Sequence, residues 1–249
     1  KMNMLATLAT DDTIATEKDS VGSSRILESG LYGLKVVFAY VTKSTGGAIG
    51  LVLNLKNEQG QEIRSTQWMT SGTAKGAKNF YEKDGEKHYL PGFIMANSLC
   101  LLTVGKEISQ LETEQKVIPV YNSEAKSEVP TKVDMLTDLL GQEILAGVIK
   151  QTVDKTKKNE ATGTYEPTGE TREENEIDKF FRARDRMTTA EIRAKAETAA
   201  FADTWSAKWT GKSRDKSKGA SAAGTAGMPG RKPAAAAQAA GKPANSLFA

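Results

Sequence analysis

The segment 49–68 constrains the fold of this chain more than any other, because apolar and polar residues alternate on both sides of one glycine. Its first half places four aliphatic residues on one face of a strand. A three-residue loop at Glu58–Gly60, with the glycine in the left-handed conformation, would set Leu55 opposite Ile63. A four-residue loop would set Asn54 opposite Ile63 and mix the two faces. The sequence therefore predicts an antiparallel hairpin with one apolar face.

The other face of this hairpin is expected to be polar and charged. The same register sets Arg64 opposite Asn54 and Trp68 opposite Gly50. Lys56 falls on this face as well. We therefore predict a surface that presents cations, an amide and a large indole side by side.

Apolar patterning elsewhere predicts more short strands and one helix. The expected strands cover residues 31–41, 116–121, 133–140, 143–153 and 177–181. A helix is expected to begin at Pro91 and to stop at Gly105, with Phe93, Ile94, Leu101 and Val104 facing inward. Residues 71–89 are expected to be a long excursion, and residues 154–176 a polar, charged connection. Short strands in a meander with one inserted helix indicate a mainly β protein, folded as a small closed or nearly closed barrel.

The chain changes character after Arg182. Thr188 and Glu191 fit a capping box that would open an alanine-rich helix running to about Lys208. Phe201, Trp205 and Trp209 recur every four residues, which favours docking of this helix onto the barrel, with a nucleic-acid or partner contact as the alternative. Beyond the helix, apolar bulk is too scarce to build a core. We expect a flexible arm at 1–24, a folded domain at 25–185, a helical appendage at 186–209 and a disordered tail at 210–249.

Charge is distributed unevenly along the 249 residues. Trp205–Ala249 holds eight basic residues and one acidic residue, a net charge of +7. Residues 1–204 hold 26 basic and 30 acidic residues, a net charge of −4. Any attraction of the body for an anionic partner must therefore come from local clusters of cations.

Composition excludes several classes of protein. A single cysteine and a single histidine rule out a disulfide framework and a Cys/His zinc site. The longest apolar run, 93–104, covers about 12 residues and is too short to span a membrane. The first residues lack the pattern of a signal peptide. We therefore expect a soluble, cytoplasmic protein.

Residues that could carry out a chemical step are few. His88 lies alone in a charged loop, and Cys100 lies in an apolar context that would keep its thiol protonated. The segment Gly72–Lys78 has three residues between its glycines, whereas a phosphate-binding loop has four, and Asn79 follows its last lysine. The acidic residues 170–176 are expected to be a solvated loop. The sequence therefore predicts a protein that is not an enzyme and that holds no metal or cofactor.

Residues 64–89 combine aromatic rings with cations. Four of the chain's 16 aromatic residues lie in this window with five basic ones, a mixture that suits unstacked bases on an anionic backbone. Packing of Phe80 and Tyr81 under their own loop is the alternative for those two rings. The lysines at 155–158 could form the other wall of a groove. The candidate DNA-binding residues are Trp68, Arg64, Lys56, Lys75, Lys78, Phe80, Tyr81, Lys83, Lys87, Tyr89, Lys155, Lys157 and Lys158.

Four runs, Gln67–Gly76, Tyr81–Lys83, Gly85–Gly92 and Glu166–Asn175, resemble single-stranded DNA-binding proteins of short-tailed bacteriophages. The resemblance extends over about residues 28–182. It implies an oligonucleotide-binding (OB) fold, to which the residue pattern adds one inserted helix, a C-terminal helix and a disordered tail. It also implies a protein that coats single-stranded DNA and supports phage DNA replication, recombination and repair in the host cytoplasm.

The last residues of the tail suggest a second kind of contact. Leu247 and Phe248 are bulky and apolar but have no core to join. They could dock on a polymerase, a recombination protein or a transcription protein, or they could be incidental. A basic tail cannot act by mimicking the negative charge of DNA. The alternative function is therefore a protein-interaction hub or transcription co-factor that acts through the tail, with DNA binding secondary. The oligomeric state is not predicted.

Overall fold

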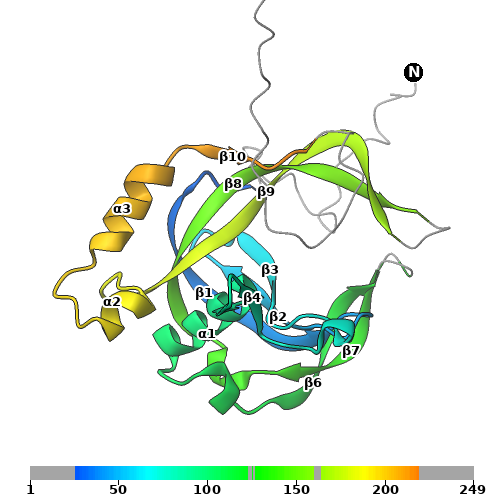
Figure 1. Cartoon of the computed structure of the whole chain (residues 1–249), viewed down its shortest axis with the longest axis horizontal. Coiled ribbons are helices and arrows are strands. Elements are labelled where there is room, and N and C mark those ends of the chain that lie inside the picture. Colours follow the sequence, from blue (N-terminus) through cyan, green and yellow to red (C-terminus); the bar gives the residue numbers. More distant parts are fainter. Residues whose placement is uncertain (1–25, 123–124, 126, 160–163, 219–249) are drawn as a thin grey trace, which may run out of the picture.

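Most strands belong to one strongly curved sheet in the computed structural model, which describes residues 26–122, 125, 127–159 and 164–218 (Figure 1). The strands of this sheet are β1 (Gly30–Lys43), β2 (Ile49–Lys56), β3 (Glu62–Trp68), β6 (Glu114–Asn122), β7 (Ser127–Met135), β8 (Glu143–Lys158), β9 (Tyr165–Arg182) and β10 (Ser213–Asp215). Their order is β10-β8-β1-β2-β3, with β9 paired to β8 and the β6–β7 hairpin paired to β1. Every pair is antiparallel except β10 with β8.

The sheet curls without closing. Within the described residues, β3 pairs only with β2 and β9 pairs only with β8, so these two strands form free edges that face each other. The expected mainly β fold is confirmed. The expected closure into a barrel is not confirmed.

The β2–β3 hairpin has the register that the sequence predicts. Asn57 donates its backbone N–H to the Gln61 carbonyl at 3.0 Å, and Gly60 has a φ of +82°. A three-residue loop therefore joins the strands. The pairs Leu55–Ile63, Asn54–Arg64 and Gly50–Trp68 follow from it, as predicted.

The main core lies between the inner face of the sheet and α1 (Pro91–Thr103). It includes Leu34, Val36 and Ala39 of β1, Leu51, Leu53 and Leu55 of β2, and Ala96, Leu99, Cys100 and Leu102 of α1. Pro91 begins the helix as predicted, but the prediction that Ile94 faces inward is wrong, because Ile94 is exposed. Ala96 and Cys100, both small and fully buried, belong to the core instead.

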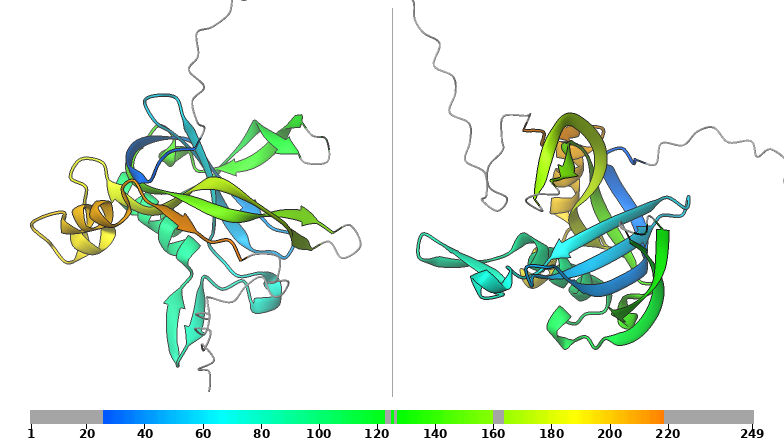
Figure 2. Two further views of the ribbon diagram at one scale, coloured as in Figure 1. Left: turned by 90° about the horizontal axis from the view of Figure 1, so that it is seen from above. Right: turned by 90° about the vertical axis from the view of Figure 1, so that its right-hand side faces the viewer.

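Residues 71–89 are more regular than the sequence analysis expected. They contain a separate hairpin of β4 (Phe80–Lys83) and β5 (Glu86–Tyr89), which stands out from the curved sheet (Figure 2). Asp84 and Gly85 have φ values of +54° and +81°, as a type I′ turn requires. Asp84-Gly85 is a sequence pattern typical of this turn, and it could have indicated the hairpin.

The polar stretch 154–176 is also not a loop, because β8 extends to Lys158 and β9 begins at Tyr165. The two strands form a solvated ribbon held by cross-strand polar pairs such as Gln151–Glu174 and Lys155–Glu170. Its alternating charges hide the strand signal, since neither face of the ribbon is apolar. Another expected strand, 133–140, ends at Met135 and continues into a 3₁₀ turn at Thr137–Leu139.

The C-terminal helix expected at 188–208 is two short helices, α2 (Thr189–Arg193) and α3 (Ala200–Trp209). The predicted capping box is present, because Thr188 Oγ1 accepts from the Glu191 N–H and the Glu191 carboxylate accepts from the Thr188 N–H. Lys195, with a φ of +53°, ends the first helical segment.

The chain beyond α3 is ordered further than expected. The tail was predicted to begin at residue 210, but Ser213–Asp215 form β10 beside β8. The expected arm at 1–24 and the tail beyond Lys218, including Leu247 and Phe248, lie outside the described residues. None of the described helices is both long enough and apolar enough to cross a membrane.

Candidate nucleic-acid interface

The candidate site lies on the face of β1, β2 and β3 that points away from the core, here called the outer face. Directly paired residues of an antiparallel sheet share a face, so the register determines its members. They are Phe38 and Tyr40 of β1, Val52, Asn54 and Lys56 of β2, and Glu62, Arg64, Thr66 and Trp68 of β3.

Trp68 lies at the end of β3 with 44% of its surface exposed. Its indole covers Gly50, since a Cβ added to Gly50 would lie 2.8 Å from the indole Cε3. The backbone of Trp68 is in turn covered by Gly92, in the first turn of α1. The neighbouring strand and the helix therefore fix the position of the ring while leaving much of it open to solvent.

Two further aromatic residues on this face were missed in the sequence analysis. A β-bulge at Val37 shifts the register of β1, so Phe38 pairs with Asn54 and Tyr40 pairs with Val52. Both rings are half-buried. Simple alternation from Val36 would have pointed Phe38 into the core, and no residue type in this apolar run marks the bulge.

Arg64 is the cation at the centre of the outer face. Its side chain is exposed, and among the described residues it has no carboxylate partner. Burial raises the pKa of the Tyr40 hydroxyl, and the positive charge of Arg64 opposes that rise. Arg64 therefore lies near Tyr40. Lys56, at the end of β2, differs from Arg64 because its Nζ lies 4.0 Å from Glu62 Oε1.

The β4–β5 hairpin begins close to Trp68 and carries the other predicted aromatic residues. Backbone hydrogen bonds of 2.8 Å join Ser71 to Lys78 and Leu90 to Asn79 at its base. The ammonium groups of Lys78 and Lys87 lie 5.4 and 5.0 Å from the centroid of the Phe80 ring. Phe80, Lys87, Tyr89 and Asn79 line a surface hollow of about 370 Å³.

The remaining residues of the hairpin are largely exposed. Tyr81 lies 5.5 Å from His88, and Tyr89 lies 5.0 Å from Phe93, measured between ring centroids. Tyr81 and Tyr89 are exposed, so the alternative that Tyr81 packs under its own loop is wrong. Lys75 and Lys83 are exposed too, and among the described residues neither has an ion-pair partner.

The lysines predicted to form the other wall lie on the β8–β9 ribbon. Lys155 pairs with Glu170 at 2.9 Å, whereas Lys157 and Lys158, with Tyr165 opposite Lys158, lie at the exposed end. Figure 2 shows this ribbon and the β4–β5 hairpin extending in different directions. The structure therefore separates these lysines from the hairpin.

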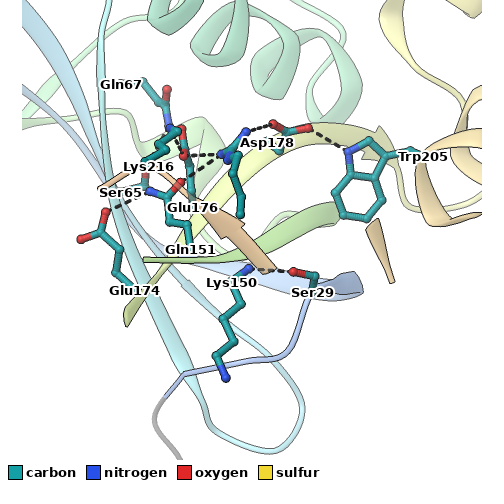
Figure 3. Close-up of polar contacts among 11 residues, drawn as sticks. Ser29, Ser65, Gln67, Lys150, Gln151, Glu174, Glu176, Asp178, Trp205 and Lys216 are labelled. Carbon is teal, nitrogen blue, oxygen red and sulfur yellow. Dashed lines mark hydrogen bonds and ion pairs between the residues drawn. The ribbon is translucent and has the colours of Figure 1, made fainter. Parts of the chain in front are cut away.

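The cleft between the free edges of β3 and β9 holds acidic and basic groups that compensate each other. Glu176 pairs with Lys216 at 2.6 Å (Figure 3). Arg214 pairs with Glu176 at 2.5 Å and with Asp178 at 3.3 Å. Glu176 and Asp178 of β9 are thus engaged by the C-terminal segment. Arg64 lines the same cleft, so the cation of the outer face borders these acidic groups without pairing to them among the described residues.

The residues considered for catalysis offer little chemistry. Burial raises the pKa of the Cys100 thiol to about 12, which keeps it protonated at neutral pH. His88 Nε2 lies 3.9 Å from Glu86 on the exposed hairpin, and neither contacts a nucleophile among the described residues. No group of three His, Cys, Asp or Glu side chains in the described part of the chain is arranged to hold a metal ion.

Comparison with known proteins adds no family. The chain matches no protein-family model and no curated protein.

Proposed function

We propose that this chain is a non-catalytic single-stranded DNA-binding protein. The observation that carries the proposal is the exposed indole of Trp68 on the same sheet face as the unpaired guanidinium of Arg64. Phe38 and Tyr40 lie on that face too, on β1, with β2 between them and β3. The resemblance to phage single-stranded DNA-binding proteins supports the same function. In that role the protein coats and protects single strands during phage DNA replication, recombination and repair.

The curved sheet suits this function as an OB-type barrel that is open between β3 and β9. In OB folds, the face formed by the second and third strands binds oligonucleotides. Trp68 and Arg64 lie on β3 and Lys56 on β2, so the candidate residues occupy the corresponding strands. The β4–β5 hairpin adds Phe80, Tyr81 and Tyr89 at the end of the same face.

Stacking and phosphate neutralisation together would give binding without sequence preference. Each base that stacks on an aromatic ring gains about 1–3 kcal/mol, whichever base it is. Arg64 and the unpaired lysines of the hairpin would contact phosphates and release counterions. Duplex DNA hides its bases, so the stacking contribution is available only from a single strand.

The direct test is a fluorescence titration of the full chain with oligo-dT, with a duplex of the same length and with an RNA of the same length. We expect tight binding to oligo-dT, quenching of tryptophan fluorescence and much weaker binding to duplex. Comparable affinity for duplex and single strand would exclude the stacking mechanism. The titration with RNA shows whether the binding face tolerates the 2′-hydroxyl of the ribose.

Removing the two lysines beside Phe80 is expected to lower the salt dependence of binding. In the variant Lys78→Ala/Lys87→Ala, the slope of log affinity against log salt should fall by roughly 0.7 for each phosphate contact that is lost. The measurement is a titration with oligo-dT at several salt concentrations.

The matched control is Lys208→Ala. The Lys208 ammonium lies 5.2 Å from the Trp209 ring on α3, so this variant also loses a cation–ring contact, but outside the proposed interface. Equal slopes in both variants would show that the hairpin lysines do not contact phosphates.

A further inference from the structure

Asn54 is an unexpected residue at the centre of the outer face. Its neighbours on that face are apolar or long, it is only 4% exposed, and asparagine is unfavourable in the middle of a strand. Among the described residues its Oδ1 has no hydrogen-bond partner. A buried acceptor without a partner costs free energy, so an apolar residue would stabilise this position better.

Within the described part of the chain, the amide of Asn54 makes one side-chain hydrogen bond, and its partner is Glu62. Asn54 Nδ2 donates to Glu62 Oε2 at 3.1 Å, and Lys56 Nζ lies 4.0 Å from Glu62 Oε1. Both carboxylate oxygens of Glu62 are therefore directed toward β2. Arg64, two residues further along β3, has no carboxylate partner among the described residues.

We propose that Asn54 is a positioning residue, which holds the Glu62 carboxylate over β2 and thereby leaves the Arg64 guanidinium free to bind a phosphate. The proposal rests on the proposed function, since it assigns Arg64 to the DNA backbone. It gives a reason for a buried amide whose acceptor is unpaired.

The geometry makes the competing contact available. Glu62 and Arg64 are two residues apart on one strand, so their side chains leave the same face about 7 Å apart. Side chains of this length can meet across that distance and form a charge-assisted pair. Without the amide, Glu62 would turn along β3 and neutralise Arg64. A phosphate would then have to displace a carboxylate before it could bind.

The test compares Asn54→Leu, Glu62→Gln, Arg64→Gln and the double variant Asn54→Leu/Glu62→Gln in titrations with oligo-dT. Asn54→Leu is expected to weaken binding about five- to tenfold and to lower the salt slope by roughly 0.7, as Arg64→Gln does. Glu62→Gln alone should bind no more weakly than the wild type, because it removes an acidic group beside Lys56. The double variant should regain the affinity and slope of Glu62→Gln, because the competing carboxylate is gone.

A purely structural role would give a different pattern. Asn54→Leu would then lower the melting temperature, and Glu62→Gln would not restore binding. We expect the opposite, a melting temperature that is unchanged or higher, because the substitution removes a buried unpaired acceptor. If leucine disturbs the sheet, Asn54→Thr provides a β-branched residue that is too short to reach Glu62. Adding Glu62→Gln to Asn54→Thr should then restore DNA binding as it does for Asn54→Leu.

A measurement without DNA separates this proposal from the proposed function. Exchange of the Arg64 Nε proton with water, followed by NMR, should slow in Asn54→Leu and return to the wild-type rate in the double variant. Unchanged exchange in Asn54→Leu would overturn the proposal even if the protein binds DNA. A second outcome is also informative: exchange slows in Asn54→Leu, but Arg64→Gln leaves DNA binding unchanged. In that case Asn54 does control the Glu62 carboxylate, but Arg64 does not bind a phosphate.

Discussion

Trp68→Ala is expected to weaken binding of single-stranded DNA by about 5- to 150-fold, the equivalent of the 1–3 kcal/mol that one stacked base contributes. The loss should be similar on oligo-dT, oligo-dC and mixed sequences, because a ring stacks on every base. The salt slope should stay the same, since no phosphate contact is removed. The folded state should persist, because the indole lies on the surface at 44% exposure.

Gly50→Val is the matched test of how the ring is held. A side chain at this position would push against the indole, whose Cε3 lies 2.8 Å from an added Cβ. The variant keeps Trp68 but moves it, so its affinity for oligo-dT should fall toward that of Trp68→Ala. The melting temperature of each variant shows whether folding is affected. Wild-type affinity in Trp68→Ala would place the stacking on other residues, with Phe38 and Tyr40 the next to replace.

The β2–β3 hairpin could be predicted in detail because three independent signals agree. Leu51, Leu53 and Leu55 alternate strictly, Gly60 permits the left-handed turn, and Ile63 resumes the alternation at the right distance. Only one register keeps the apolar side chains together. That register also placed Arg64 and Trp68 on the opposite face, which is why half of the candidate site could be found without a structure.

The other half of the site depends on an irregularity that the sequence does not mark. Phe38 and Tyr40 reach the outer face only because Val37 is an extra residue in β1. Valine is an ordinary strand residue, and the run around it is apolar on both faces. The burial of Asn54 could not be foreseen either, because it depends on how the side chains of two neighbouring strands cover the amide.

Other differences from the sequence analysis have local causes. The β8–β9 ribbon is polar on both faces, so alternation gives no signal, and its pairing depends on cross-strand charges such as Lys155–Glu170. The C-terminal segment contains few apolar residues, yet Arg214 joins the sheet through ion pairs with acidic residues of β9. Long-range pairing of this kind lies beyond any local pattern.

The C-terminal segment gives the largest stability prediction. Trp205 is 4% exposed, its indole packs against Gly147 of β8, and its Nε1–H donates to Asp178 at 2.8 Å. Asp178 also pairs with Arg214, so the indole and the last strand share one carboxylate (Figure 3). Trp205→Ala should therefore lower the free energy of unfolding by about 3–5 kcal/mol, since it leaves a large cavity and removes a buried hydrogen bond.

A thermal unfolding curve measures this loss, which corresponds to a fall in melting temperature of roughly 6–20 °C for a domain of this size. Phe201→Ala is the matched control, because Phe201 lies on the same helix but is 43% exposed, and a change of about 1 kcal/mol or less is expected there. Similar melting temperatures for the two variants would mean that α3 does not stabilise the sheet.

Removal of all residues after Arg182 should be more damaging than Trp205→Ala, because it also leaves Glu176 and Asp178 without Arg214. Loss of DNA binding by that fragment would therefore reflect unfolding and would not show that α3 contacts DNA.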